Sequence, residues 1–127
     1  QQHHVARMQQ VEQAGAVAEG VRLPWSMVTS SKSRKFAKRF TQRFGRSPDY
    51  AAAHMYDAVH LLVAAMRRGG LDRTGIQEAI WSLAPWPGVT GPIRWDAVGG
   101  NCRPVGMGVI RAGRVQSVSL PASTSCH

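Results

Sequence analysis

The hydrophobic positions of this chain follow one period in its middle and another toward its end. Phe36, Phe40 and Phe44 recur at every fourth residue between basic positions, a spacing that predicts an amphipathic helix closed by Gly45. The C-terminal part alternates between apolar and polar residues instead, which is typical of strands. Three runs are strand candidates: 89–95, 105–111 and 114–118, the last two joined by a tight turn at Ala112–Gly113.

A second, longer helix is predicted directly after Gly45. Ser47 suits its N-cap, Pro48 its first position, and Asp49 complements the positive end of the helix dipole. The pattern from residue 50 to residue 66 is apolar on almost every face. A helix of this kind belongs between layers of a fold, so we expect it to be widely covered.

Weaker signals flank these two helices. Upstream, a helical pattern stops near Gly20, and an apolar extended run continues from Val21 to Val28. Downstream, Thr74 and Gln77 predict the capping box of a third, shorter helix.

Turn-forming residues are concentrated in the segment GVTGPIRWDAVGG, residues 88–100. Gly88 and the pair Gly91–Pro92 should flank or bend an edge strand, because glycine permits positive φ and proline lacks a ladder donor. The residues from Asp96 to Gly100 should then reverse the chain. The segment by itself predicts a hairpin and no more.

The formal net charge is +9, and seven of the sixteen Lys and Arg residues fall between Lys32 and Arg46. This balance raises the hypothesis of nucleic-acid binding. No aromatic-interleaved ribonucleoprotein motif, zinc-finger spacing or helix-turn-helix glycine pattern accompanies the basic run. We therefore interpret it as the solvated face of the first helix, and keep nucleic-acid binding as an alternative.

Candidate chemistry is sparse. No Gly-x-Ser-x-Gly elbow, phosphate-binding glycine loop or paired-His motif occurs, so no catalytic residue, metal ligand or cofactor is predicted. His54 and Asp57 can share a helix face, where we interpret them as polar edges of a packed helix. Cys102 and Cys126 are interpreted as two unrelated thiols, with a single bridge between them as the alternative if the protein is exported. The longest apolar stretch, 58–66, is shorter than a membrane span.

Three motifs give the chain a resemblance to a known family. They are Ala-Glu-Gly-Val at 18–21, Tyr-Asp-Ala-Val at 56–59, and Gly-Val-x-Gly-Pro-Ile-x-x-Asp at 88–96. In this order they resemble the C-terminal third of type I periplasmic solute-binding proteins, most of all the leucine/isoleucine/valine-binding proteins of ATP-binding-cassette (ABC) importers. The resemblance covers residues 14–118. Residues 1–13 would be the remnant of a preceding helix or linker, and 119–127 a loose tail.

The resemblance implies an α/β fold: a C-terminal fragment of a two-lobed protein, with three helices and a few strands. Val21 to Val28 would leave one lobe, the helices between Ser33 and Met66 would pack on the sheet of the other, and the last strands would return. The glycine-rich hairpin would lie near the lobe boundary and carry no ligand chemistry. A start without Met agrees with a fragment.

The resemblance also implies a non-catalytic, exported protein that traps an amino acid, branched-chain or similar, between its lobes and meets a membrane permease. Tyr56 would form a wall of the ligand cleft, with a plain core role as the alternative, and Trp25 is a weaker candidate for the same cleft. A sensor domain of the same fold is an alternative function.

The resemblance implies that the sheet covering the long apolar helix is encoded upstream of this chain. We therefore expect the isolated chain to self-associate through this helix, and not to bind free amino acids by itself. The side chains expected to be uncovered on that helix are Met55, Val59, Leu61, Leu62, Val63 and Met66.

Overall fold

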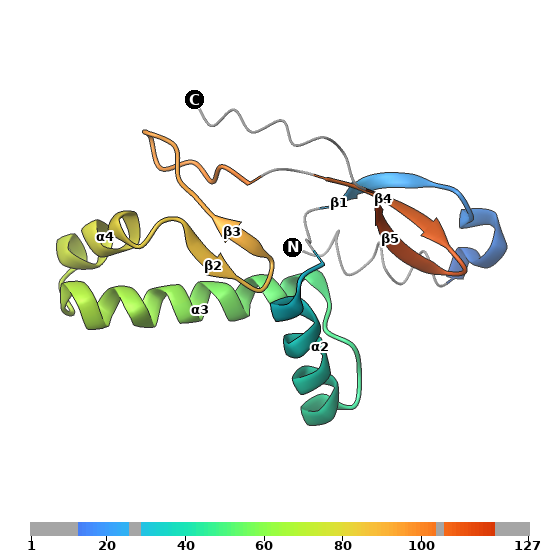
Figure 1. Ribbon diagram of the computed structural model, residues 1–127, viewed down its shortest axis with the longest axis horizontal. Coiled ribbons are helices and arrows are strands. Elements are labelled where there is room, and N and C mark those ends of the chain that lie inside the picture. Colours follow the sequence, from blue (N-terminus) through green and yellow to red (C-terminus); the bar gives the residue numbers. More distant parts are fainter. Residues whose placement is uncertain (1–12, 26–28, 104–105, 119–127) are drawn as a thin grey trace. The chain divides into compact units, whose positions relative to one another are not determined.

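The computed structural model describes residues 13–25, 29–103 and 106–118, which divide into two compact units (Figure 1). The chain passes from the first unit to the second between Val28 and Thr29, and leaves the second between Arg103 and Pro104. The predicted terminal segments 1–13 and 119–127 lie, except for Gln13, outside the described residues.

The first unit is a small antiparallel sheet with strand order β1-β4-β5. Its elements are the 3-10 helix η1 (Gly15–Ala18) and the strands β1 (Arg22–Trp25), β4 (Gly106–Arg111) and β5 (Arg114–Val118). Ala112 and Gly113 join β4 to β5, and both have positive φ, 50° and 69°, so the predicted tight turn is confirmed. Ile110 and Ala18 are its buried apolar side chains within the described residues.

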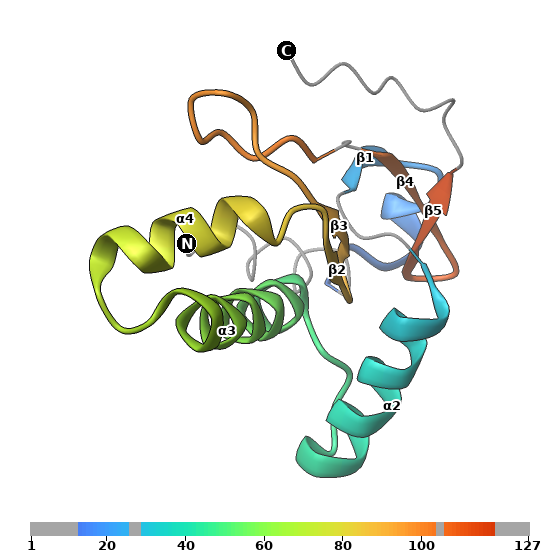
Figure 2. The ribbon, with the colours of Figure 1, turned by 60° about the vertical axis from the view of Figure 1, so that its left-hand side comes forward.

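The second unit contains three helices and a two-stranded hairpin (Figures 1 and 2). Its elements are α2 (Ser31–Phe44), α3 (Tyr50–Gly69), α4 (Arg73–Ser82), β2 (Trp86–Gly88) and β3 (Gly91–Ile93). Helices α3 and α4 lie side by side, and the hairpin lies along α3, whereas α2 extends away from both other helices.

The first predicted helix is confirmed, including its end. Gly45 adopts the left-handed conformation, φ 68°, and its N–H bonds to the Thr41 carbonyl. At the other end the Ser30 and Ser33 side chains form a reciprocal capping box, each accepting from the other residue's backbone N–H. Local sequence therefore fixes both ends of α2.

The predicted caps of the other two helices are wrong. Asp49, not Ser47, is the N-cap of α3 and accepts a hydrogen bond from Ala52 N at 2.8 Å. In α4 the N-cap is Asp72, two residues before Thr74, and its carboxylate accepts from Gly75 N. In both cases the helix begins directly after an aspartate that reaches the third helical N–H, which leaves the other candidate without a capping role.

Helix α3 buries one stripe rather than its whole circumference. Every fourth residue of that stripe is covered: Ala53, Asp57, Leu61 and Ala65. Leu61 is therefore buried, contrary to the expectation that it is uncovered. Met55, Val59 and Leu62 remain exposed, as expected, whereas Val63 and Met66, which were also expected to be uncovered, are half-buried.

Glycine allows α3 and α4 to approach closely where they meet. A Cβ atom on Gly69 would collide with the backbone carbonyl of Gly75, and one on Gly75 would collide with that of Gly69. Both positions exclude a side chain, so the two helices meet backbone to backbone at this end.

The glycine-rich segment forms a hairpin whose bounds differ from the predicted strand 89–95. Residues Val89 and Thr90 are the turn between β2 and β3, while Trp95 pairs with Asn101 in an isolated bridge. The predicted chain reversal at Asp96–Gly100 is confirmed, because Asp96 N bonds to the Gly100 carbonyl and the Asp96 carboxylate accepts from Gly100 N.

Cys102 follows this reversal and is disulfide-bonded, so the interpretation of the cysteines as unrelated thiols is wrong for Cys102. Cys126 lies outside the described residues.

Candidate functional site

A buried carboxylate on α3 organises the second unit. Asp57 is only 2% exposed and accepts hydrogen bonds from both backbone N–H groups of the hairpin turn, Val89 N at 2.7 Å and Thr90 N at 3.0 Å. Thr90 Oγ1 donates a third bond to the same carboxylate at 2.5 Å. The carboxylate thereby satisfies the turn's donors and ties the hairpin to α3.

The same contact explains why glycine precedes the turn. A Cβ atom on Gly88 would collide with the Asp57 carboxylate, so this position admits no side chain while Asp57 holds the hairpin. It also explains the misplaced strand: the N–H groups of Val89 and Thr90 bond to Asp57 and cannot enter a ladder.

Arg103, the last residue of the segment 29–103, extends the cluster. Its Nη1 donates to Thr90 Oγ1 at 2.5 Å and lies 3.4 Å from Nδ1 of His54. The end of this segment is thus connected to the hairpin turn, and through Thr90 to Asp57. We call Asp57, Thr90 and Arg103 the latch.

Sequence reasoning missed the role of Asp57. We expected His54 and Asp57 to be polar edges of a helix, but Asp57 is a buried anchor. A signal was present: Asp57 and Gly88 both belong to motifs that carry the family resemblance. The motifs alone did not show that the two residues meet across the fold.

Tyr56, the predicted cleft residue, lies next to the latch in sequence but on another face of α3. Its ring is half-buried and packs between Phe36 of α2, centroid distance 4.8 Å, and His60, at 4.3 Å. Phe40 and Phe44 continue the row along α2, with centroids 5.8 Å and 4.6 Å apart in turn. Tyr56 therefore joins α2 to α3 and retains a partly open ring.

Trp25, the second candidate, belongs to the first unit. It ends β1, is half-buried, and its side chain packs against Gly108 of β4, where a Cβ atom would lie 3.3 Å from Trp25 Cβ. Trp25 and Tyr56 are thus in different units.

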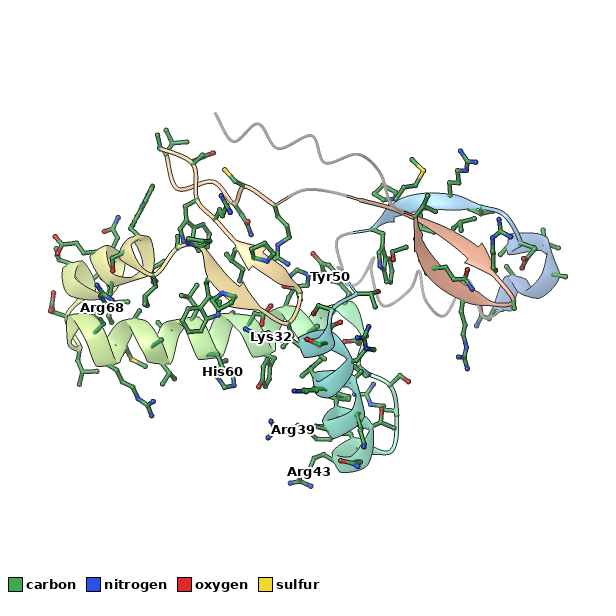
Figure 3. All side chains as sticks on the ribbon, in the orientation of Figure 1. Lys32, Arg39, Arg43, Tyr50, His60 and Arg68 are labelled. Carbon is green, nitrogen blue, oxygen red and sulfur yellow. The ribbon has the colours of Figure 1, made fainter. Side chains whose placement is uncertain are left out.

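A hollow of about 430 Å³ lies beside the aromatic row in the second unit. It includes His60, which points away from α4 and the hairpin in Figure 3. Apolar and cationic side chains share its lining: His60, Val63, Ala64, Arg67, Arg68, Leu83 and Trp86. Such a lining suits a molecule that combines an apolar part with a negative charge.

The described ranges show neither a metal site nor a membrane-spanning element. No group of three or more His, Cys, Asp or Glu residues within them could hold a metal ion. None of the helices in this part of the chain is long and apolar enough to cross a bilayer.

Comparison with known proteins identifies the class. A model of the periplasmic binding protein family matches residues 5–111. The fold is similar to a leucine-binding protein, LivK, from Thermotoga maritima, with a TM-score of 0.75 and 25% identity over 88% of this chain. It is also similar to a putative branched-chain amino acid ABC transporter from Rhodospirillum rubrum, TM-score 0.70 and 28% identity over 87% of this chain.

The chain therefore belongs to the periplasmic binding protein family. This confirms the resemblance to its leucine/isoleucine/valine-binding branch, and the α/β fold matches a fragment of the type I architecture. The chain spans 33% of the Thermotoga protein and 34% of the Rhodospirillum protein. A solute-binding protein from R. palustris in complex with benzoate shares the fold, with a TM-score of 0.68 and 18% identity over 90% of this chain and 34% of that one. No curated protein sequence matches the chain.

Proposed function

We propose that this chain is part of the solute-binding component of an ABC importer, and that the complete component binds a branched-chain amino acid or a similar small carboxylate. The observation that carries the proposal is the match of most of the chain to this family, together with its likeness to leucine-binding LivK. The same relationship supports a non-catalytic protein that is exported and meets a membrane permease.

Tyr56 is the residue proposed to touch the solute. An aromatic face packs well against an aliphatic side chain, and the hydroxyl can reach a polar group of the same molecule. The half-buried ring supports this role, because contacts with Phe36 and His60 fix its orientation without enclosing it. A ring held in place before binding loses little conformational freedom when the solute arrives.

Asp57 supports the site indirectly. It follows Tyr56 on α3, and its bonds to the hairpin turn hold the helix at one rotation about its axis. Adjacent helical residues project about 100° apart, so burying Asp57 directs Tyr56 to a neighbouring face. Asp57 is thus a positioning residue for Tyr56.

Trp25, in the first unit, is proposed as a second and weaker candidate for contact with the solute. It ends the last described segment before the chain passes into the second unit, and its half-buried ring offers a further apolar surface.

Calorimetry on the complete protein, with leucine, isoleucine, valine and benzoate as ligands, tests the proposal. We expect Tyr56→Ala to weaken binding by about 1–3 kcal/mol while the protein stays folded, and Trp25→Ala to weaken it less. Comparison of Tyr56→Phe with Tyr56→Ala distinguishes the contribution of the hydroxyl to the affinity from that of the ring. Phe44→Ala, at an exposed ring of the same row, is the matched control and should leave the affinity unchanged.

Binding that is unaffected by Tyr56→Ala would assign Tyr56 to the core. A complete protein that binds none of the four ligands, nor any other amino acid, would overturn the proposed solute class.

The isolated chain is proposed to self-associate through the exposed apolar stripe of α3. Met55, Val59 and Leu62 are 63%, 50% and 44% exposed and lie at helical spacing on one face. Pairing of two chains would remove this surface from water. Light scattering during size exclusion should show a dimer or larger species at tens of micromolar, and Val59→Lys with Leu62→Lys should restore a monomer. A monomeric native chain would contradict this.

A further inference from the structure

Helix α2 and the residues just after it carry many positive charges and no negative ones. Seven basic residues fall within 32–46, and no acidic residue interrupts them. All seven side chains are exposed: Lys32, Arg34, Lys35, Lys38, Arg39, Arg43 and Arg46. At about 100° per residue, four of them fall within an arc of about 80° on one flank of the helix. We call these four, Lys32, Lys35, Arg39 and Arg43, the basic ridge.

The ridge is not neutralised by the protein itself. Within residues 13–25, 29–103 and 106–118 no ion pair involves its side chains, and Lys32 Nζ donates only to the Pro87 carbonyl, at 3.1 Å. Figure 3 shows Lys32, Arg39 and Arg43 projecting to the same side of α2. Like charges this close together repel one another. An anionic surface that approaches them therefore lowers their electrostatic free energy, which no partner within the described residues already does.

The apolar side of the same helix is covered at one end and open at the other. Phe36 is buried against Tyr56, Phe40 is half-buried, and Phe44 in the last turn is 58% exposed. The Arg43 guanidinium lies 5.7 Å from the Phe44 ring centroid. An exposed phenyl ring beside arginines is the composition of helices that lie in a membrane interface.

We propose that α2 docks on an anionic phospholipid surface, with Phe44 entering the boundary between headgroups and acyl chains. The basic ridge lies on the flank of the helix, about 100° round from Phe44 at Arg43, and its long side chains reach the headgroups from there. The inference goes beyond the proposed function and does not require it. For a component that serves a membrane importer, such docking would keep it close to the membrane plane.

Two features favour lipid over nucleic acid as the occupant. Stacking of single-stranded nucleic acid requires several exposed aromatic faces in a row. Phe36 is buried and Phe40 is half-buried, so Phe44 is the one exposed ring of α2. A lipid surface, in contrast, requires no geometric match: it uses the summed charge and a single apolar contact.

Sedimentation of the full chain with vesicles tests the proposal. Phosphatidylcholine vesicles containing about 30% phosphatidylglycerol should bind the chain, pure phosphatidylcholine should not, and about 0.5 M NaCl should abolish binding. Replacing Lys35, Arg39 and Arg43 by Gln should lower the partition coefficient roughly 100-fold, since each cation near the surface contributes about fivefold. Gln preserves helix propensity, so α2 should remain folded.

The matched control removes the same charge from exposed sites of the second unit outside α2: Arg67→Gln, Arg68→Gln and Arg73→Gln. It should change the partition coefficient by less than about threefold, because only cations within a Debye length of the surface contribute. Phe44→Ala should lower it roughly tenfold without altering its salt dependence.

Equal losses in the two triple variants would show a net-charge effect and overturn the assignment to α2. No binding to the anionic vesicles would overturn the proposal outright. Tighter binding to duplex DNA than to the vesicles at the same salt would replace the lipid by nucleic acid. None of these outcomes bears on amino-acid binding, so the proposed function is tested separately.

Discussion

The β2–β3 hairpin and helix α2 are held in the second unit by opposite means. The hairpin is short and rich in glycine and proline, and it is fixed by the buried Asp57, whose partners are 32 and 33 residues away in sequence. Helix α2 is regular and capped at both ends by its own neighbours. Its ring contacts with the rest of the unit are made through Phe36. Residues close in sequence are enough to determine a helix such as α2, whereas the position of the hairpin depends on a polar contact between residues distant in sequence.

The largest expected effect comes from removing the latch. Asp57→Ala leaves two backbone N–H groups and a threonine hydroxyl without their acceptor in a buried site. We expect a loss of about 3–5 kcal/mol in the free energy of unfolding, measured by urea denaturation. Asp72→Ala, at an exposed helix cap, is the control and should cost about 1 kcal/mol. Equal losses in the free energy of unfolding for the two variants would show that the latch stabilises the protein no more than an ordinary helix cap.

Gly88→Ala is expected to cost about 2–3 kcal/mol, because the added methyl group meets the Asp57 carboxylate. The cost should fall below about 1 kcal/mol in the Asp57→Ala background, where the methyl group has room. Urea denaturation of the four proteins of this cycle measures the coupling. Additive costs would mean that Gly88 is required for some reason other than Asp57.

Thr90→Val removes the hydroxyl that connects Asp57 to Arg103 while preserving the shape of the side chain. We expect a loss of about 1–2 kcal/mol, because a buried carboxylate and a guanidinium each lose a partner. Thr41→Val, at an exposed position of α2, is the matched control and should change stability by less than about 0.5 kcal/mol. A stability change no larger than that of the control would remove Thr90 from the latch.

The smallest effect belongs to α2. Ser30→Ala removes the acceptor for Ser33 N and should cost about 1 kcal/mol or less, visible as reduced helical circular dichroism before global unfolding. The hairpin signals should change little in this variant, because the hairpin is fixed by Asp57 and its hydrogen bond to α2, from Lys32 Nζ to the Pro87 carbonyl, is exposed. A simultaneous loss of both would show that they form one cooperative unit.

The contrast between the two elements also explains what sequence could predict. Both the amphipathic pattern of α2 and its end at Gly45 follow from residues within a few positions, so they were predicted correctly. The turn at Ala112–Gly113 is equally local. The strand 89–95 was misplaced because the backbone donors of Val89 and Thr90 are used by a residue of another helix.

The caps of α3 and α4 show a different limit. In each case two suitable side chains lie two residues apart, and the helix begins directly after the aspartate, which is the cap. For the candidate site, family motifs singled out Tyr56 and a half-buried ring is found there. Its stacking on Phe36 and the anchoring role of Asp57 depend on contacts that no periodicity encodes.

Amide hydrogen exchange, followed residue by residue by NMR, tests most directly the claim that one buried carboxylate fixes the hairpin. The N–H groups of Val89 and Thr90 should be among the slowest to exchange and should open only with global unfolding, although they lie in a turn. Amides in the last turn of α2 should exchange at least tenfold faster through local fraying. Exchange of Val89 and Thr90 at the rate of exposed loop amides would contradict the account.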